Sequence, residues 1–452
     1  MTPLHLSSIT DLAPRLASGE VRSVEVTRAC LDAIARRNGD LNAFISVFGD
    51  VALAQASAAD ADLLAGRCRG PLHGVPISLK DLIDVAGVPT TAASRVRVDA
   101  VARRDAPIVT RLRKAGAIII GKCNLHEFAF GTTSEESAYG PTRHPLDAAR
   151  SPGGSSGGSA VSVATGMAFA SIGTDTGGSI RIPAAACGAV GLKPTFAEFP
   201  CDGIVPLSRS LDHAGPIART VGDVRIVYAA LRGSTLAVQA AAPVPLPPAS
   251  LRLGLLEPYF MDAMDEEVRA RFADALDRLR SGGVRIGEVS VPHAADTPAV
   301  YLHIQLPEAS AYHASALGRQ PQDYQPGVRL RLELGRYVLA EDYVRAQRGR
   351  EVLRCEVDAA LGGHHAIVLP TLSIPAPRFG TATAMVGATA EPVRALMLRE
   401  TQLFNLTGHP AISIPCGTTA AGLPCGLQLV GRINRTRDLL DVAACCESLL
   451  RT

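Results

Sequence analysis

The sequence has no excess of charge of one sign. Its 452 residues include 45 lysines and arginines against 43 aspartates and glutamates, which gives a formal net charge of +2. The two signs are mixed along the chain, so the surface offers no field that would hold a polyanion. We therefore expect no direct binding of nucleic acid.

Signals for export and for membrane insertion are also lacking. The first residues, MTPLHLSSITDLAPRLASGE, alternate polar and apolar side chains without the basic start, apolar run and cleavage site of a secretion signal. No apolar stretch approaches the roughly 20 residues that span a bilayer. We expect a soluble protein of the cytoplasm that does not contact a membrane.

Cysteine pairs of the CxxC type are absent. The ten cysteines are scattered, and Cys445 and Cys446 lie in an apolar helical pattern, so we expect reduced core thiols rather than disulfides or a zinc site. His126 in HEFAF lacks the second histidine of a zinc protease, while Asn124 with Glu127 predicts a helix capping box. The sequence predicts neither a metal nor a cofactor.

What the sequence does contain is an alternation of strands and amphipathic helices. VPISL and AIII, at 75–79 and 117–120, flank the helical pattern DAPIVTRLRKAG, which opens with Asp105 as its expected N-cap. The same order returns in LRLGLL, DEEVRARFADALDRLRSGG and VRIGEVSV, at 251–291. This alternation predicts an α/β fold with a large mixed central β-sheet covered on both faces by α-helices.

The proline-rich segment AAPVPLPPAS, at 241–250, is the clearest linker-like stretch. Three apolar strands follow later, AIVLP, AISIP and GLQLV, and they need helices of the first half to cover them. We therefore expect a single domain over residues 1–452, in which residues from about 251 to 400 add elements around a shared sheet.

The segment SPGGSSGGSA, at 151–160, is too rich in glycine and serine for an ordinary turn. Its glycines have the spacing of a phosphate-binding loop, but Ser159 stands where the lysine belongs. A nucleophile elbow can be centred on Ser155 or Ser156, although Pro152 and the charged approach are poor strand material. A flexible linker is disfavoured because the apolar AVSVATGMAFASIG follows at once.

A second loop, GTDTGGSIRIP at 173–183, combines a strand with a glycine turn. The strand MAFASIG leads into it, and IRIPAAACG predicts a helix start. Gly177 and Gly178 expose the backbone N–H groups from Thr176 to Ser179, which suits an anion-binding nest for an oxyanion. The simpler alternative is a tight turn with Ser179 as the N-cap of the helix.

Lys80 follows the apolar strand in GVPISLKDLIDVAG. A lysine held there loses hydration, which lowers its pKa and leaves a neutral amine able to act as a base. The simpler alternative is a lysine at a strand end whose ammonium group extends to solvent.

Together, Lys80 in PISLKD, the loop GGSSGGS and the loop TDTGGSIRIPA resemble the amidase signature family of Ser-Ser-Lys hydrolases. The resemblance covers residues from about 72 to 220, the expected signature core, and resumes at FNLTGHPAISIPCG and GLPCGLQLVG. The resemblance implies the amidase signature fold and a reaction that needs no cofactor.

The resemblance also implies roles for individual residues. Ser179 attacks the amide carbonyl to form an acyl-enzyme, Lys80 is the base, and Ser155, after a cis peptide bond, passes the proton between them. The oxyanion hole is formed by the turn of Thr176, Gly177, Gly178 and Ser179. Ser156, Asp175 and Arg181 match supporting positions of the motif, and we expect Asp175 and Arg181 to brace the loops.

The family contains both stand-alone amidases and the glutaminase A subunit of the tRNA-dependent amidotransferase. EFAFGTTSEESAYGPTRHP and LELGRYVLAEDYVRAQ are similar to that glutaminase, but ALMLRETQLF has Arg399 where we expect an acidic residue to hold the amino group of glutamine. We therefore favour a stand-alone amidohydrolase that cleaves the C–N bond of a small carboxylic amide or ureido compound and releases ammonia or an amine. The glutaminase is the alternative.

A third interpretation is a non-catalytic binding protein on the same scaffold. It predicts that a catalytic residue is missing, whereas Lys80, Ser155 and Ser179 are all present. The sequence leaves open the size of the acyl pocket, a homodimer and the need for a small partner subunit.

Overall fold

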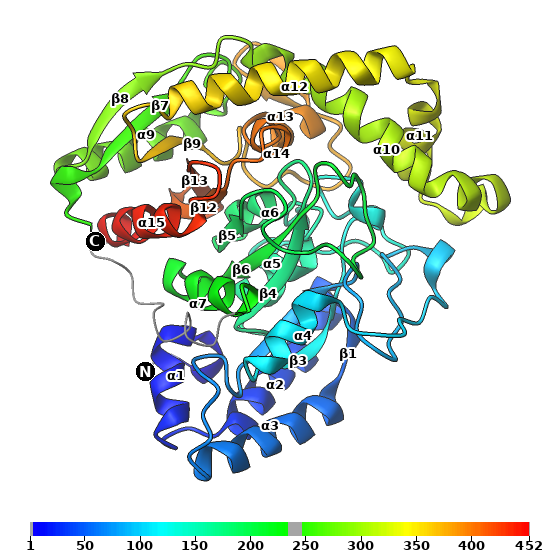
Figure 1. Ribbon diagram of the computed structural model, residues 1–452, viewed down its shortest axis with the longest axis vertical. Coiled ribbons are helices and arrows are strands. Elements are labelled where there is room, and N and C mark those ends of the chain that lie inside the picture. The colour runs from blue at the N-terminus through cyan, green and yellow to red at the C-terminus, as the bar shows by residue number, and fades with distance from the viewer. Residues whose placement is uncertain (1–2, 234–245, 452) are drawn as a thin grey trace.

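The computed structural model describes residues 3–233 and 246–451 (Figure 1). Its helices are α1 (Ile9–Ala17), α2 (Ser23–Leu41), α3 (Gly49–Leu64), α4 (Pro107–Lys114), α5 (Gly157–Ala164), α6 (Arg181–Ala186), α7 (Val221–Leu231), α9 (Glu266–Ser281), α10 (Thr297–Arg319), α11 (Pro326–Leu334), α12 (Ala340–Ala360), α13 (Val393–Arg399), α14 (Leu403–Leu406) and α15 (Thr436–Arg451). Its strands are β1 (Phe44–Val47), β2 (Pro76–Lys80), β3 (Ile118–Cys123), β4 (Ala170–Asp175), β5 (Val190–Lys193), β6 (His213–Ala218), β7 (Arg252–Leu256), β8 (Arg285–Val289), β9 (Ala366–Pro370), β10 (Thr383–Val386), β11 (Thr389–Pro392), β12 (Ala411–Thr418) and β13 (Pro424–Val430).

Eleven strands form one mixed sheet in the order β1-β3-β2-β4-β6-β5-β12-β13-β9-β7-β8. Strand β2 is parallel to β3 and β4, and β7 is parallel to β8 and β9. The remaining pairs of this sheet are antiparallel. The α/β fold with a large mixed sheet is therefore confirmed.

Late strands continue the sheet of the first half of the chain. Ala411 of β12 lies opposite Lys193 of β5, and Val430 of β13 lies opposite Ile367 of β9. The proline-rich segment at 241–250 is described only from residue 246. The single-domain organisation stays a prediction, which this continuous pairing favours.

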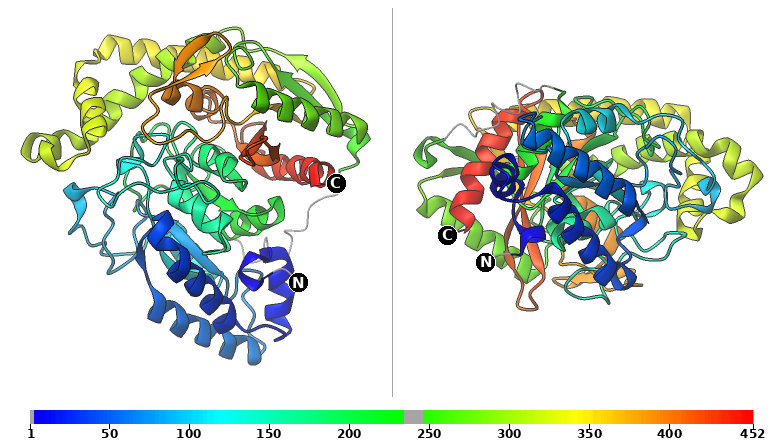
Figure 2. Two further views of the ribbon diagram at one scale, coloured as in Figure 1. Left: turned by 180° about the vertical axis from the view of Figure 1, so that it is seen from behind. Right: turned by 90° about the horizontal axis from the view of Figure 1, so that it is seen from below.

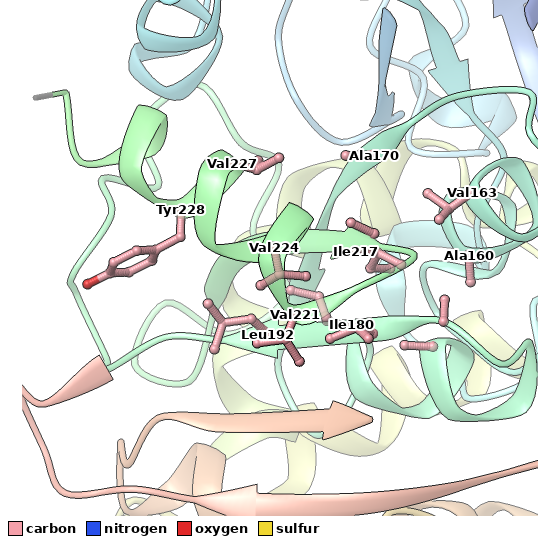
Figure 3. Close-up of a cluster of buried hydrophobic side chains, with 14 of the residues drawn as sticks. Ala160, Val163, Ala170, Ile180, Leu192, Ile217, Val221, Val224, Val227 and Tyr228 are labelled. Atoms are coloured by element: carbon pink, nitrogen blue, oxygen red, sulfur yellow. The ribbon is translucent and has the colours of Figure 1, made fainter. Parts of the chain in front are cut away.

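Helices cover both faces of the sheet and bury its apolar side chains. In Figure 3, Val224 and Val227 of α7 lie near Ile217 of β6, and Ala160 and Val163 of α5 belong to the same cluster. All five side chains are fully buried. Burial of this apolar area, at about 25 cal/mol per Å², fixes the helices on the sheet.

The helices of the later chain lie far from those of the N-terminal region. In Figures 1 and 2, α10, α11 and α12 occupy the end of the molecule opposite α1, α2 and α3. Helix α10 nevertheless places Tyr301 inside the protein, where 2% of the residue is exposed. A helix of the later chain thus contributes a buried side chain next to Gly177.

The N-cap of the helix expected from 105 lies one residue later than predicted. Helix α4 has Ala106 as its N-cap and Pro107 in its first turn, and proline is favoured there because its missing N–H needs no partner. The Asp105 carboxylate instead accepts hydrogen bonds from the Ala86 N–H at 2.8 Å and from Arg113 at 2.9 Å. The N-cap prediction for Asp105 was wrong.

The predicted capping box of Asn124 and Glu127 was also wrong. Glu127 begins only a single 3₁₀ turn (Glu127–Ala129), in which Phe128 takes a left-handed φ of 51° that stops any helix. Asn124 donates to the Gly140 carbonyl at 3.0 Å, and Glu127 accepts from the Gln325 N–H at 2.7 Å. Both side chains therefore hold neighbouring segments together.

All ten cysteines are free thiols, and Cys446 of α15 is buried. Burial raises the pKa of the Cys187 and Cys446 thiols, which keeps them protonated.

Over residues 3–233 and 246–451, no helix is long and apolar enough to cross a membrane. The same residues contain no group of three or more histidine, cysteine, aspartate or glutamate side chains placed to hold a metal ion.

Candidate active site

Lys80 ends the buried strand β2 and has no exposed surface. Its Nζ donates hydrogen bonds to Ser155 Oγ at 2.7 Å and to Thr174 Oγ1 at 2.8 Å. The parallel pairing of β2 with β4, with Leu79 opposite Ile172, brings Lys80 and Thr174 to the same edge of the sheet. The alternative in which the ammonium group extends to solvent was wrong.

Burial lowers the pKa of the Lys80 amine to about 7, although the negative charges of Asp175 and Asp212 oppose this shift. Desolvation penalises the charged ammonium form, and no carboxylate contacts Nζ directly to offset the penalty. A large share of Lys80 is therefore neutral near pH 7. A neutral amine hydrogen-bonded to a hydroxyl can accept its proton.

Residues 151–156 form a packed loop that positions Ser155. The peptide bond between Gly154 and Ser155 is cis, as the family resemblance implies. The Ser155 carbonyl accepts from the His126 N–H at 3.1 Å and from Ser134 Oγ at 3.3 Å. A Cβ on Gly154 would lie 2.9 Å from the Ser134 nitrogen, so only glycine fits there. The loop is therefore not a flexible linker. In the described chain no strand leads directly into it, whereas a nucleophile elbow requires one.

The turn that carries Ser179 follows β4 directly and leads into α6. Ser179 is 7% exposed, whereas Lys80 and Ser155 are completely buried. The N-cap of α6 is Ile180, whose side chain makes no capping hydrogen bond, and the Ile180 N–H donates to Asp175 Oδ2 at 3.0 Å. Capping by its own side chain does not explain Ser179, which is the least buried of the three residues.

The backbone of this turn presents unpaired donors. Within the described chain, none of the N–H groups from Thr176 to Ser179 donates a hydrogen bond to another residue. A Cβ on Gly177 would lie 2.5 Å from the Tyr301 hydroxyl, and one on Gly178, where φ is 138°, would clash with Thr401 Oγ1. Both glycines are therefore required, and the free N–H groups suit a developing negative charge.

Ser156 connects the two loops. Its N–H donates to the Ser179 carbonyl at 3.2 Å, and its Oγ donates to the Thr174 carbonyl at 3.2 Å. Among the described residues no hydrogen bond joins the hydroxyls of Ser155 and Ser179. The structure thus brings Lys80 and Ser155 into direct contact and holds Ser179 on the adjoining turn.

Asp175 and Arg181 form a buried ion pair at the base of this turn. Neither side chain is exposed, and the carboxylate accepts from Arg181 Nη2 at 2.9 Å and Nε at 3.1 Å. Burial alone would raise the pKa of Asp175, but the Arg181 charge holds it well below its usual range. Arg181 also donates to Asn405 Oδ1 and Gln428 Oε1, at 2.7 and 2.6 Å. The pair therefore braces the turn against later strands and helices.

A second carboxylate holds the first residue of the turn. Asp212 accepts from Thr176 Oγ1 at 2.6 Å and from the Leu207 N–H at 3.0 Å. Burial raises the pKa of Asp212 to about 6, so it is mostly ionised at pH 7. Thr174, Thr176 and Asp212 line a cavity of about 80 Å³, which places open space beside the turn.

Sequence reasoning missed three neighbours of this site: Thr174, Asp212 and Tyr301. Thr174 begins the motif TDTGGSIRIPA, and Asp212 lies within the stretch from about 72 to 220 that resembles the family. Their polar side chains were the available signal. Tyr301 belongs to α10, more than a hundred residues further along the chain, and nothing in its local pattern connects it to Gly177.

Arg399 does not contact the turn. Its Nε donates to the Tyr259 carbonyl at 2.9 Å, and its guanidinium carbon lies 3.9 Å from the centre of the Tyr259 ring. The preceding residue, Leu398, faces the turn instead, with Cδ2 3.1 Å from the position of a Cβ on Gly177. Arg399 therefore gives no information about the ligand of the site.

Comparison with known proteins shows the family of the chain. The model of the Amidase family matches residues 25–440, and the chain belongs to this family, that of the amidase signature. It is a hydrolase that acts on carbon–nitrogen bonds of amides.

Three relatives illustrate the range of the family. The chain is 41% identical to an amidase of Pseudomonas putida, with 94% of this chain and 92% of the relative covered. It is 39% identical to the A subunit of the glutamyl-tRNA(Gln) amidotransferase of Roseiflexus sp. (strain RS-1), with 98% and 96% covered. A crystal structure of an amidase superposes with a TM-score of 0.92 at 35% identity, covering 98% of this chain and all of the other.

Proposed function

We propose that the protein is a stand-alone amidohydrolase that cleaves a small carboxylic amide or ureido compound through Lys80, Ser155 and Ser179. The observation that carries the proposal is the 2.7 Å hydrogen bond from the buried Lys80 amine to Ser155 Oγ. It lies beside the turn whose serine, Ser179, is the least buried of the three. A base, a proton carrier and a nucleophile are the parts that acyl transfer needs.

The proposed reaction has two balanced halves. Neutral Lys80 accepts the proton of Ser155, Ser155 accepts that of Ser179, and Ser179 Oγ attacks the carbonyl carbon. The N–H groups of the turn, Thr176, Gly177, Gly178 and Ser179, stabilise the oxyanion. Collapse breaks the C–N bond, and the proton returns through Ser155 to the departing nitrogen, which leaves as ammonia or an amine. Water then repeats the sequence on the acyl-enzyme and releases the carboxylic acid.

A second candidate function is the glutaminase of a tRNA-dependent amidotransferase. The 39% identity to the Roseiflexus protein over 98% of this chain favours it. The similar identity to the P. putida amidase favours a stand-alone enzyme equally. Both candidates use the same site, so only the substrate and the requirement for partners separate them.

The two candidates are distinguished by assaying the purified chain by itself. We expect it to release ammonia or amine from simple amides or ureas without ATP, tRNA or other subunits. Ammonia release from glutamine only, and only after other subunits have been added, would show that the second candidate is right.

We also expect kcat/KM for an amide to rise with pH through about 7, because only the neutral Lys80 amine acts as base and its pKa is about 7. Below that value the rate should fall roughly tenfold per pH unit. Asp212→Asn removes a negative charge that raises the Lys80 pKa, so the rise should move to lower pH. A pH profile that is unchanged in the residual activity of Lys80→Met would assign the titration to another group.

A further inference from the structure

Helix α13 lies directly against the Ser179 turn. Leu398 approaches Gly177, and Thr401, just beyond the helix, donates to the Gly177 carbonyl at 2.6 Å. Arg394 lies four residues before Leu398, so the two side chains share one face of the helix. The Arg394 side chain therefore starts about 6 Å along the helix axis from the residue that touches the turn.

Arg394 is a partly buried cation without a protein partner. Within residues 3–233 and 246–451, its guanidinium makes neither an ion pair nor a hydrogen bond, and its guanidinium carbon lies 5.9 Å from the centre of the Phe130 ring. Removing a guanidinium from water without a counter-charge is costly. A partner anion supplied by a ligand would remove that cost.

The neighbours of Arg394 leave this charge uncompensated. Arg331 lies 5.2 Å from the same Phe130 ring, but it is paired with Glu136 at 2.9 Å. His126, which also contacts Glu136, adds no charge at pH 7 because burial lowers its pKa to about 4. Glu136 is thus paired with Arg331 and His126, and no carboxylate of the described residues forms an ion pair with Arg394.

We propose that Arg394 binds a carboxylate carried by the substrate, so that the preferred substrates are amides with a second, anionic group. This inference rests on the proposed function, since it assumes that the amide carbonyl reacts at Ser179. Arginine suits this task because its planar N–H groups match the two oxygens of a carboxylate.

The test compares two pairs of substrates that differ in charge but little in shape. Succinamate against 4-oxopentanamide places the carboxylate on the acyl side, and N-acetylglycine against N-acetylaminoacetone places it on the amine side. We expect the wild type to prefer the anionic member of one pair by at least tenfold in kcat/KM. Arg394→Met should lower kcat/KM for that anion by roughly 10- to 100-fold and change the neutral member by less than about threefold.

Arg399→Met is the matched control, because it removes the same charge from the same helix at a residue that is bound to Tyr259. It should keep the preference, and Arg394→Lys should keep part of it. Absence of preference in both pairs, or a preference that survives in Arg394→Met, would overturn the proposal.

A binding measurement separates this proposal from the proposed function. Calorimetry with Ser179→Ala measures the affinity for succinamate and N-acetylglycine without turnover. We expect one of them to bind at least tenfold more weakly when Arg394→Met is added, even if the wild type hydrolyses no amide. Equal affinity with and without Arg394 would contradict the carboxylate site, whereas wild-type inactivity on every amide would contradict only the proposed reaction.

Discussion

Ser179→Ala is expected to lower amide hydrolysis by roughly 10⁵- to 10⁶-fold, which is the scale of the loss when a serine nucleophile is removed. No base or oxyanion donor can replace the missing Oγ, since the acyl-enzyme then cannot form. Steady-state release of ammonia or amine measures the loss. The same variant should also lose ester hydrolysis, because both reactions pass through the acyl-enzyme.

The fold should tolerate this change. The Ser179 hydroxyl makes no hydrogen bond to another described residue, so its removal leaves no buried donor or acceptor unpaired. Thermal unfolding of Ser179→Ala should therefore match the wild type. Ser159→Ala, in the buried helix α5, is the control serine and should keep most of the activity. Activity of Ser179→Ala within about tenfold of wild type would remove Ser179 from the mechanism.

The second large effect is expected for the proton carriers. Lys80→Met and Ser155→Ala should each lower kcat/KM for an amide by about 10²- to 10⁴-fold, the usual contribution of a general acid or base. An amide nitrogen must be protonated as it leaves, whereas an alkoxide leaves an ester without that help. Both variants should therefore lose less activity on an ester with the same acyl group.

Methionine is the better replacement for Lys80 because the side chain is fully buried and an alanine there would leave a cavity. Kinetic constants for one matched amide and ester in both variants decide the point. Equal losses on the two substrates in Lys80→Met would show that Lys80 does not protonate the leaving group.

The parts of the site that could be predicted from the sequence are those with a local signal. Gly178 takes a φ of 138°, which favours glycine, and Lys80 ends a strand that is buried at every residue. These constraints act within a few residues of the chain. The order of strands and helices has the same local origin, in the periodicity of apolar side chains.

What could not be predicted depends on contacts between distant segments. The partner of Lys80, Thr174, comes from the pairing of β2 with β4, and Tyr301 reaches Gly177 from α10. Arg399 was singled out because of its place in a motif, but the helix turns Leu398 toward the site and Arg399 toward Tyr259. A one-residue difference on a helix rotates a side chain by about 100°, and no local pattern fixes that rotation.

The central claim is that Ser179, and not a serine of the neighbouring loop, carries the acyl group. Treatment with a serine-directed fluorophosphonate, followed by proteolysis and mass mapping of the labelled peptide, tests it most directly. The account predicts one adduct, on Ser179, and slower labelling in Lys80→Met. An adduct on Ser155 or Ser156 in place of Ser179 would contradict it.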